Sequence, residues 1–141
     1  MTQHRRMTEI CRSRAPVTLP PTATVRQAAR LMRDRKIGAI LVTDEAGGLL
    51  GIFTGRDAVG RVLAEGRSAA RTTLRDVMTP SPATLHAGAS AIDALHLMQD
   101  GGFRHVPVMN EGRLSGIASF ADFRGVEHAR LDEETGYWEI M

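Results

Sequence analysis

The sequence contains an internal repeat, and this repeat constrains the fold more than any other feature. Residues 24–57 read TVRQAARLMRDRKIGAILVTDEAGGLLGIFTGRD, and residues 90–122 read SAIDALHLMQDGGFRHVPVMNEGRLSGIASFAD. Identical residues lie 66 positions apart, then 65 after a one-residue gap near position 46, as in Ala28/Ala94, Val42/Val108, Gly51/Gly116 and Asp57/Asp122. A unit of about 60 residues buries too little surface to be secure alone. We therefore expect the two copies to pack on each other, with clefts between them in which a function should be sought.

Both copies show the same succession of hydrophobic patterns, which predicts strand, helix, strand, strand, helix. In the first copy we expect a strand at 17–19, a helix from the N-cap Thr24 to Arg35, strands at 39–42 and 49–53, and a helix at 55–65 with Val59, Val62 and Leu63 inward. In the second copy the same elements fall at 83–85, 90–99, 104–109, 114–118 and 120–129. Short helices are expected at 8–12 and 74–78.

These patterns divide the chain into a tail, two repeats, a connector and a terminal segment. We expect a loose tail at 1–7, a first repeat at 8–66, a connector at 67–75, a second repeat at 76–129, and a C-terminal segment at 130–141. The fold class is therefore α/β (α+β), built from two pseudo-symmetric β-α-β-β-α units.

The composition excludes several classes of protein. The net charge of +2 is modest and no long basic run occurs, so binding to nucleic acid is not expected. No apolar stretch approaches the length of a membrane span, and the first residues lack the apolar core of a signal peptide. The single cysteine fits a reducing compartment and the histidines show no metal-ligand spacing, so we expect a cytoplasmic protein without a metal site.

A hydroxyl and a carboxylate stand three residues apart where each hairpin passes into the next helix. They are Thr54 and Asp57 in the first copy, and Ser119 and Asp122 in the second. This spacing is typical of a capping box, which satisfies backbone donors at a helix start. The same groups can also bind a nucleotide, with the carboxylate on a ribose diol and the hydroxyl and helix amides facing phosphate. The two interpretations are compatible, because the hydroxyl can cap while the carboxylate binds.

The two halves resemble cystathionine β-synthase (CBS) domains. The resemblance depends on GAILVTDEAGGLLGIFTGRD and FRHVPVMNEGRLSGIASFAD and covers about residues 8–129, so the chain is similar to a stand-alone CBS pair. It implies two repeats packed sheet to sheet, pairs that commonly dimerise, and the binding of adenosine nucleotides or related molecules.

The resemblance also implies two nucleotide sites, each using groups from both repeats. The principal site would be formed by Thr54, Arg56, Asp57, Thr84, Arg104, His105, Val106 and Pro107. A second, weaker site would be formed by Thr18, Gly38, Ala39, Ile40, Ser119 and Asp122. The second site is expected to be weaker because Gly38, Ala39 and Ala121 stand where the first has Arg104, His105 and Arg56. His105 itself fits either a ligand contact or an inward-facing, hydrogen-bonded strand residue.

The sequence thus predicts a regulatory module and not an enzyme. No catalytic nucleophile with an adjacent histidine base and no paired catalytic acids stand out. We expect an adenosine ligand such as AMP, ADP, ATP or NAD, no tightly bound cofactor, a homodimer, and a signal passed to a separate effector protein. The alternatives are a ligand-free scaffold that dimerises or binds a partner, and an enzyme that acts on a bound nucleotide.

Overall fold

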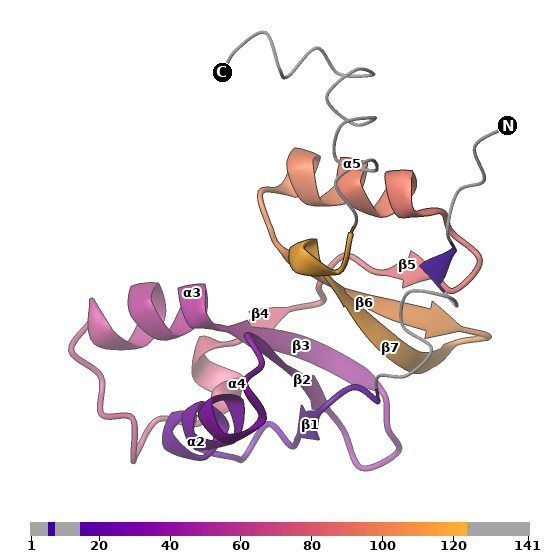
Figure 1. Ribbon diagram of the computed structural model, residues 1–141. Helices are drawn as coiled ribbons and strands as arrows, with labels where there is room; N and C mark the ends of the chain where they lie inside the picture. Colours follow the sequence, from indigo (N-terminus) through magenta and orange to yellow (C-terminus); the bar gives the residue numbers. More distant parts are fainter. Residues whose placement is uncertain (1–5, 8–14, 124–141) are drawn as a thin grey trace, which may run out of the picture. The chain divides into compact units, whose positions relative to one another are not determined.

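The computed structural model describes residues 6–7 and 15–123. Residues 16–82 form one compact unit, and the described residues from Ala83 onward form a second unit that also includes Arg6, Met7 and Ala15 (Figure 1). The expected helix at 8–12 and the C-terminal segment at 130–141 lie outside the described residues.

The first unit is a four-stranded sheet in the order β1-β2-β3-β4, with helices packed on it. The strands β1 (Thr18–Leu19) and β2 (Ala39–Thr43) are parallel, whereas β3 (Leu49–Thr54) runs antiparallel to both β2 and β4 (Thr79–Pro80). The helices are α2 (Val25–Arg35), α3 (Gly55–Asp57) with its π-helical continuation η1 (Ala58–Leu63), and α4 (Leu74–Val77). The predicted order of elements is confirmed, and β4 is an addition.

The helix α2 begins where its sequence predicts. The N–H of Gln27 donates to Thr24 Oγ1 at 3.1 Å, and Gln27 Oε1 accepts from the N–H of Thr24 at 2.8 Å. This reciprocal box satisfies two backbone donors that a helix start otherwise leaves unpaired. It also turns Val25 and Ala28 toward the sheet, where both are buried.

The core of the first unit lies between one face of its sheet and the helices α2, η1 and α4. Figure 1 shows α2 and α4 on the same side of the strands. The buried side chains are Ala23, Val25, Ala28, Ile40, Val42, Phe53, Val62, Leu74 and Val77. Leu74 and Val77 thus bury themselves in the first unit, although the sequence analysis placed them in the connector and at the start of the second repeat. Burial of these apolar side chains makes α4 part of the first unit, although the second repeat follows it directly in the sequence.

The second unit repeats the arrangement with a three-stranded sheet in the order β5-β6-β7. Its strands are β5 (Leu85–His86), β6 (His105–Asn110) and β7 (Arg113–Ser119), and its helical elements are α5 (Ala91–Gly101) and the 3-10 turn η2 (Phe120–Asp122). α5 covers one face of this sheet (Figure 1). The mixed α+β class with two small sheets is therefore confirmed.

Met7 departs from the expected loose tail. Its side chain is 0% exposed and belongs to the core of the second unit. Its N–H donates to the carbonyl of Ala89 at 2.9 Å, and Arg6 pairs with Ser90 in an isolated β-bridge. Burial of a large apolar side chain explains why this position is held in place.

The helical segment after β3 is present, but its predicted inner face is wrong at two positions. Val62 is buried, whereas Val59 and Leu63 are 60% and 72% exposed. The segment Ala58–Leu63 is π-helical, with the N–H of Ala64 bonded to the carbonyl of Val59. The i→i+5 bonding changes the angular spacing of side chains on which the α-helical prediction depended.

The helix predicted at 120–129 is not continuous. η2 ends at Asp122, and Phe123 has an extended backbone with φ −91° and ψ 144°. Phe123 is buried in the core of the second unit, so packing of its ring accompanies the end of the helical turn. Residues 124–129 lie outside the described residues.

Candidate functional site

Thr54 and Asp57 form the predicted capping box at the end of β3. The N–H of Thr54 donates to Asp57 Oδ2 at 2.9 Å, and the N–H of Asp57 donates to Thr54 Oγ1 at 3.4 Å. The Thr54 hydroxyl donates to the same Oδ2 at 3.2 Å. The capping interpretation is therefore confirmed for the first copy, and the ligand role of Asp57 remains a prediction.

Asp57 also has two contacts that the sequence analysis missed. Its Oδ1 accepts from the Thr79 hydroxyl at 3.1 Å and lies 3.6 Å from Arg61 Nε. Arg61 follows Asp57 by four positions on a helix, so an i,i+4 pairing rule could have found it. Thr79 lies on β4, and no local pattern in the sequence connects it to Asp57.

The second copy of the box is present at the end of β7. The N–H of Ser119 donates to Asp122 Oδ2 at 2.7 Å. Next to it, the N–H of Phe120 donates to the carbonyl of Arg104 at 2.8 Å, and Arg104 Cζ lies 4.8 Å from the centre of the Phe120 ring. This cation–π contact orients the guanidinium beside the box.

His105 lies half-buried at the start of β6, paired with Ser119 on β7. Burial lowers the pKa of His105 below its ordinary value, and the positive charge of Arg104 acts in the same direction, while Asp122 opposes them. Burial disfavours the charged imidazolium, so His105 is a neutral hydrogen-bonding group near pH 7.

In each unit the start of the hairpin lies directly beside the box. In the first unit Ala39 pairs with Thr54, and the N–H of Gly55 donates to the carbonyl of Gly38 at 3.3 Å. In the second unit Arg104 and His105 have the corresponding positions beside Ser119. Groups that were assigned to two different predicted sites are therefore neighbours within each unit.

The remaining predicted residues differ in how accessible their side chains are. Ile40 and Val106 pack in the two hydrophobic cores, so only their backbone groups are suited to a ligand. Ala39 and Pro107 are also buried. The exposed members are Thr18, Gly38, Arg56, Thr84 and Arg104.

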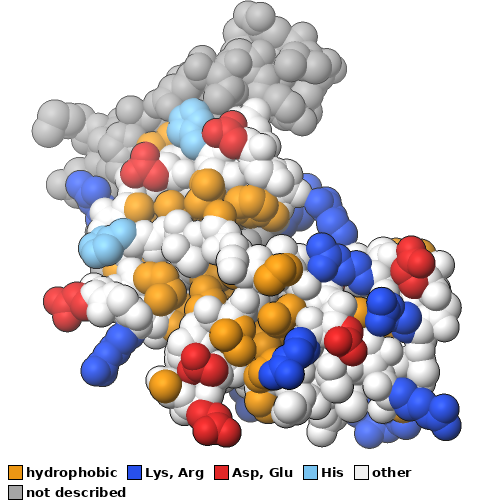
Figure 2. All heavy atoms as spheres, turned by 180° about the vertical axis from the view of Figure 1, so that it is seen from behind, with side chains coloured by type: hydrophobic (Ala, Val, Ile, Leu, Met, Phe, Trp, Pro, Cys, Tyr) orange, Lys and Arg blue, Asp and Glu red, His pale blue; other side chains and the backbone are white. Residues whose placement is uncertain are grey.

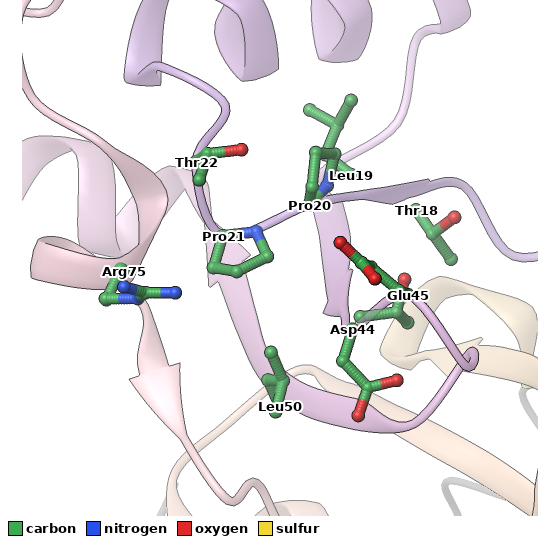
Figure 3. A pocket seen from close by; sticks show the side chains of 10 residues that line it. Thr18, Leu19, Pro20, Pro21, Thr22, Asp44, Glu45, Leu50 and Arg75 are labelled. Carbon is green, nitrogen blue, oxygen red and sulfur yellow. The ribbon is translucent and has the colours of Figure 1, made fainter.

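A pocket of about 430 Å³ lies at the other end of β2, where β1 and β2 both end (Figure 3). Figure 3 shows Arg75 and Glu45 on opposite sides of Pro20 and Pro21. It is lined by Thr18, Leu19, Pro20, Pro21, Thr22, Thr43, Asp44, Glu45, Leu50 and Arg75. Thr18 is the one predicted site residue in this lining, so the pocket is separate from the residues around Thr54.

Other kinds of site find little support in the described part of the chain. No group of three or more His, Cys, Asp or Glu residues within 6–7 and 15–123 is placed to hold a metal ion. Across the same residues, no helix has the length and apolar character needed to cross a membrane. On the face drawn in Figure 2, Lys and Arg side chains are interspersed with Asp and Glu.

Comparison with known proteins identifies the family. Residues 8–64 and 74–128 each match the CBS domain. The chain belongs to the CBS domain family. The CBS domain-containing protein CBSCBSPB3 of Arabidopsis thaliana is 39% identical over 98 residues, which cover 70% of this chain and 18% of that protein. This chain therefore spans about a fifth of the length of that plant relative.

Solved CBS structures share the fold. The CBS domain protein PAE2072 from Pyrobaculum aerophilum, complexed with AMP, matches with a TM-score of 0.82 and 25% identity over 92% of this chain and 99% of that one. A hexameric CBS-CP12 protein from bloom-forming cyanobacteria matches with a TM-score of 0.76 and 25% identity over 86% of this chain and 67% of that one. CBS neighbours thus include an AMP complex and an oligomer.

Proposed function

We propose that this CBS pair is a regulatory module that binds an adenosine nucleotide and signals to a separate effector protein. The principal ligand would be held by Thr54, Arg56 and Asp57 of the first repeat together with Thr84, Arg104 and His105 of the second. A ligand can drive a signal only through its different affinity for two states of the protein. The chain would act through such a shift and not through catalysis, as is general for stand-alone CBS proteins.

One observation carries this proposal. In both units a hydroxyl–carboxylate box lies beside the first residues of a hairpin, with an arginine close to each box: Arg56 within the first and Arg104 beside the second. A carboxylate suits a ribose diol, and a guanidinium suits phosphate. The AMP complex of the Pyrobaculum protein supports an adenosine ligand of this class.

The proposed order of the two sites depends on charge. Arg56 and Arg104 bring two guanidinium groups to the principal site, with neutral His105 as a hydrogen-bonding group. The second site, with Thr18, Gly38, Ala39, Ile40, Ser119 and Asp122, has no cation of its own and has only Arg104, which the proposal assigns to the principal site, beside its box. We expect it to bind phosphorylated ligands more weakly.

Titration calorimetry with AMP, ADP, ATP, NAD and S-adenosylmethionine tests the proposal. A hydrogen bond to a charged group is worth about 1.5–3 kcal/mol, so Asp57→Ala should weaken the bound nucleotide by about ten- to a hundredfold. Asp57→Ala also removes the box, so affinity must be measured at a temperature at which the variant is folded.

Asp76→Ala is the matched control. Asp76 accepts from the Thr73 hydroxyl at 3.4 Å in the same unit, so its loss removes a comparable contact without touching the proposed site. Asp122→Ala should affect the principal ligand less than Asp57→Ala. Equal losses from Asp57→Ala and Asp122→Ala would contradict the order of the sites.

The two alternatives give different results in the same experiments. A scaffold predicts that none of the nucleotides binds, and an enzyme predicts turnover when the protein is incubated with ATP and magnesium. We expect binding without turnover.

We also propose a homodimer, supported by the exposed Val59 and Leu63 on η1, because a second copy would remove both side chains from water.

A further inference from the structure

The carboxylate of Asp57 already has three hydrogen bonds and an ion-pair contact in this structure. Its side chain is 10% exposed, and two carboxylate oxygens offer about four acceptor positions. Oδ2 accepts from the N–H and the hydroxyl of Thr54, and Oδ1 accepts from the Thr79 hydroxyl and faces Arg61 Nε. These partners crowd a buried carboxylate, so a ribose hydroxyl that donates to Asp57 competes with them for its oxygens.

Two of these partners, Thr79 and Arg61, also connect Asp57 to β4 and to the residue before it. Arg61 faces Asp57 through Nε and donates from Nη1 to the carbonyl of Met78 at 2.8 Å. The next residue, Thr79, donates its hydroxyl to Asp57. Asp57 and Arg61 together hold Thr79, the first residue of β4, and Met78, the residue before it, and we call these contacts the β4 anchor.

The backbone pairing of β4 is short. β4 pairs with β3 at two positions, Gly51 with Pro80 and Ile52 with Thr79. Pro80 lacks an N–H, and Ser81 has a φ of 46°, which is unfavourable for a residue other than glycine. The N–H of Ser81 donates to the carbonyl of Leu50 at 3.1 Å, and the β4 anchor adds side-chain contacts to this short backbone pairing.

The contact between β3 and β4 is also close. A Cβ added to Gly51 would lie 2.8 Å from the backbone oxygen of Thr79 and 2.5 Å from Met78 Sδ. Glycine at position 51 allows β4 to approach far enough for the Thr79 hydroxyl to reach Asp57. The place of Thr79 thus depends on the strand contact as well as on the carboxylate.

We propose that a ribose diol and the β4 anchor compete for Asp57, so that nucleotide binding releases Met78 and Thr79. This inference rests on the proposed function, because it uses Asp57 as the ribose ligand. Thr79 and Arg61 are then positioning residues that hold the ligand-free state. Nucleotide binding would thus change the structure at β4, which directly precedes the second repeat in the chain.

The test compares AMP with 2′-deoxy-AMP, because their affinity ratio isolates a ribose hydroxyl from effects of charge. Thr79→Val removes the competing hydroxyl with almost no change in shape. We expect it to raise the preference for AMP over 2′-deoxy-AMP by about tenfold, the lower end of the range for one hydrogen bond to a charged group. In the wild-type protein, AMP should increase hydrogen exchange in the peptide that contains Met78 and Thr79.

Two further variants complete the experiment. Thr73→Val removes a different hydroxyl-to-carboxylate contact of the same unit, Thr73 to Asp76 at 3.4 Å, and should leave the affinity ratio unchanged. Arg61→Gln weakens the β4 anchor from its other side and should raise the ratio too, so the inference stays testable if Thr79→Val fails to fold.

The outcomes separate this inference from the proposed function. An unchanged or lower ratio in Thr79→Val and Arg61→Gln, with normal binding by the wild type, would overturn the competition and leave the nucleotide site intact. Unchanged exchange at Met78 and Thr79 on AMP binding would overturn it as well. A wild-type protein that binds neither nucleotide would remove both proposals.

Discussion

Met7 provides the sharpest test of how the second unit is built. Its side chain is 0% exposed within a core that also contains Leu95, Val106 and Phe123. Replacing a buried methionine by alanine costs about 2–5 kcal/mol, because apolar contacts are lost and a cavity remains. For Met7→Ala we expect a loss of about 3 kcal/mol, which lowers the melting temperature by about 10 °C in a domain of this size.

Urea and thermal unfolding of purified variants would measure the loss. Gln99→Ala is the control, because Gln99 is exposed on α5 of the same unit and exposed positions change stability by only about 0.5 kcal/mol. Met7→Leu keeps the volume and should cost less than about 1.5 kcal/mol. If Met7→Ala melts like the wild-type protein, residue 7 is not part of the core and the reasoning from burial is wrong.

Two other predictions concern pH and assembly. Burial lowers the pKa of His105, so the unfolded chain takes up a proton more readily than the folded one, and the free energy of unfolding should fall as the pH drops below about 6.5. His105→Gln should show a smaller loss in urea titrations at pH 7.5 and 5.5, and an equal loss would contradict this assignment. For the proposed homodimer, Val59→Glu with Leu63→Glu should yield monomers in sedimentation experiments. Ala29→Glu, at an exposed position of α2, should not, and a monomeric wild-type protein would refute the dimer.

Local interactions explain why much of the fold could be predicted from the sequence. The boxes at Thr24 and Ser90 fix two helix starts within a few residues, and the continuous apolar run at 39–42 marks a strand that is buried on both faces. The candidate site was predictable to the same extent. The box of Thr54 and Asp57 is a contact over three positions, so its residue types and spacing reveal it.

Contacts between distant residues were decided only by the tertiary structure. Met7 is buried against a repeat that begins far along the chain, and α4 covers the core of the unit before it. Asp57 accepts from Thr79, which is 22 positions away, through a strand pairing with no local signal. The sequence by itself determined the repeated strands, helices and caps, because their stabilising contacts span a few residues. The tertiary structure decided which core buries each segment and which groups reach Asp57, because those contacts form only after the chain has folded back on itself.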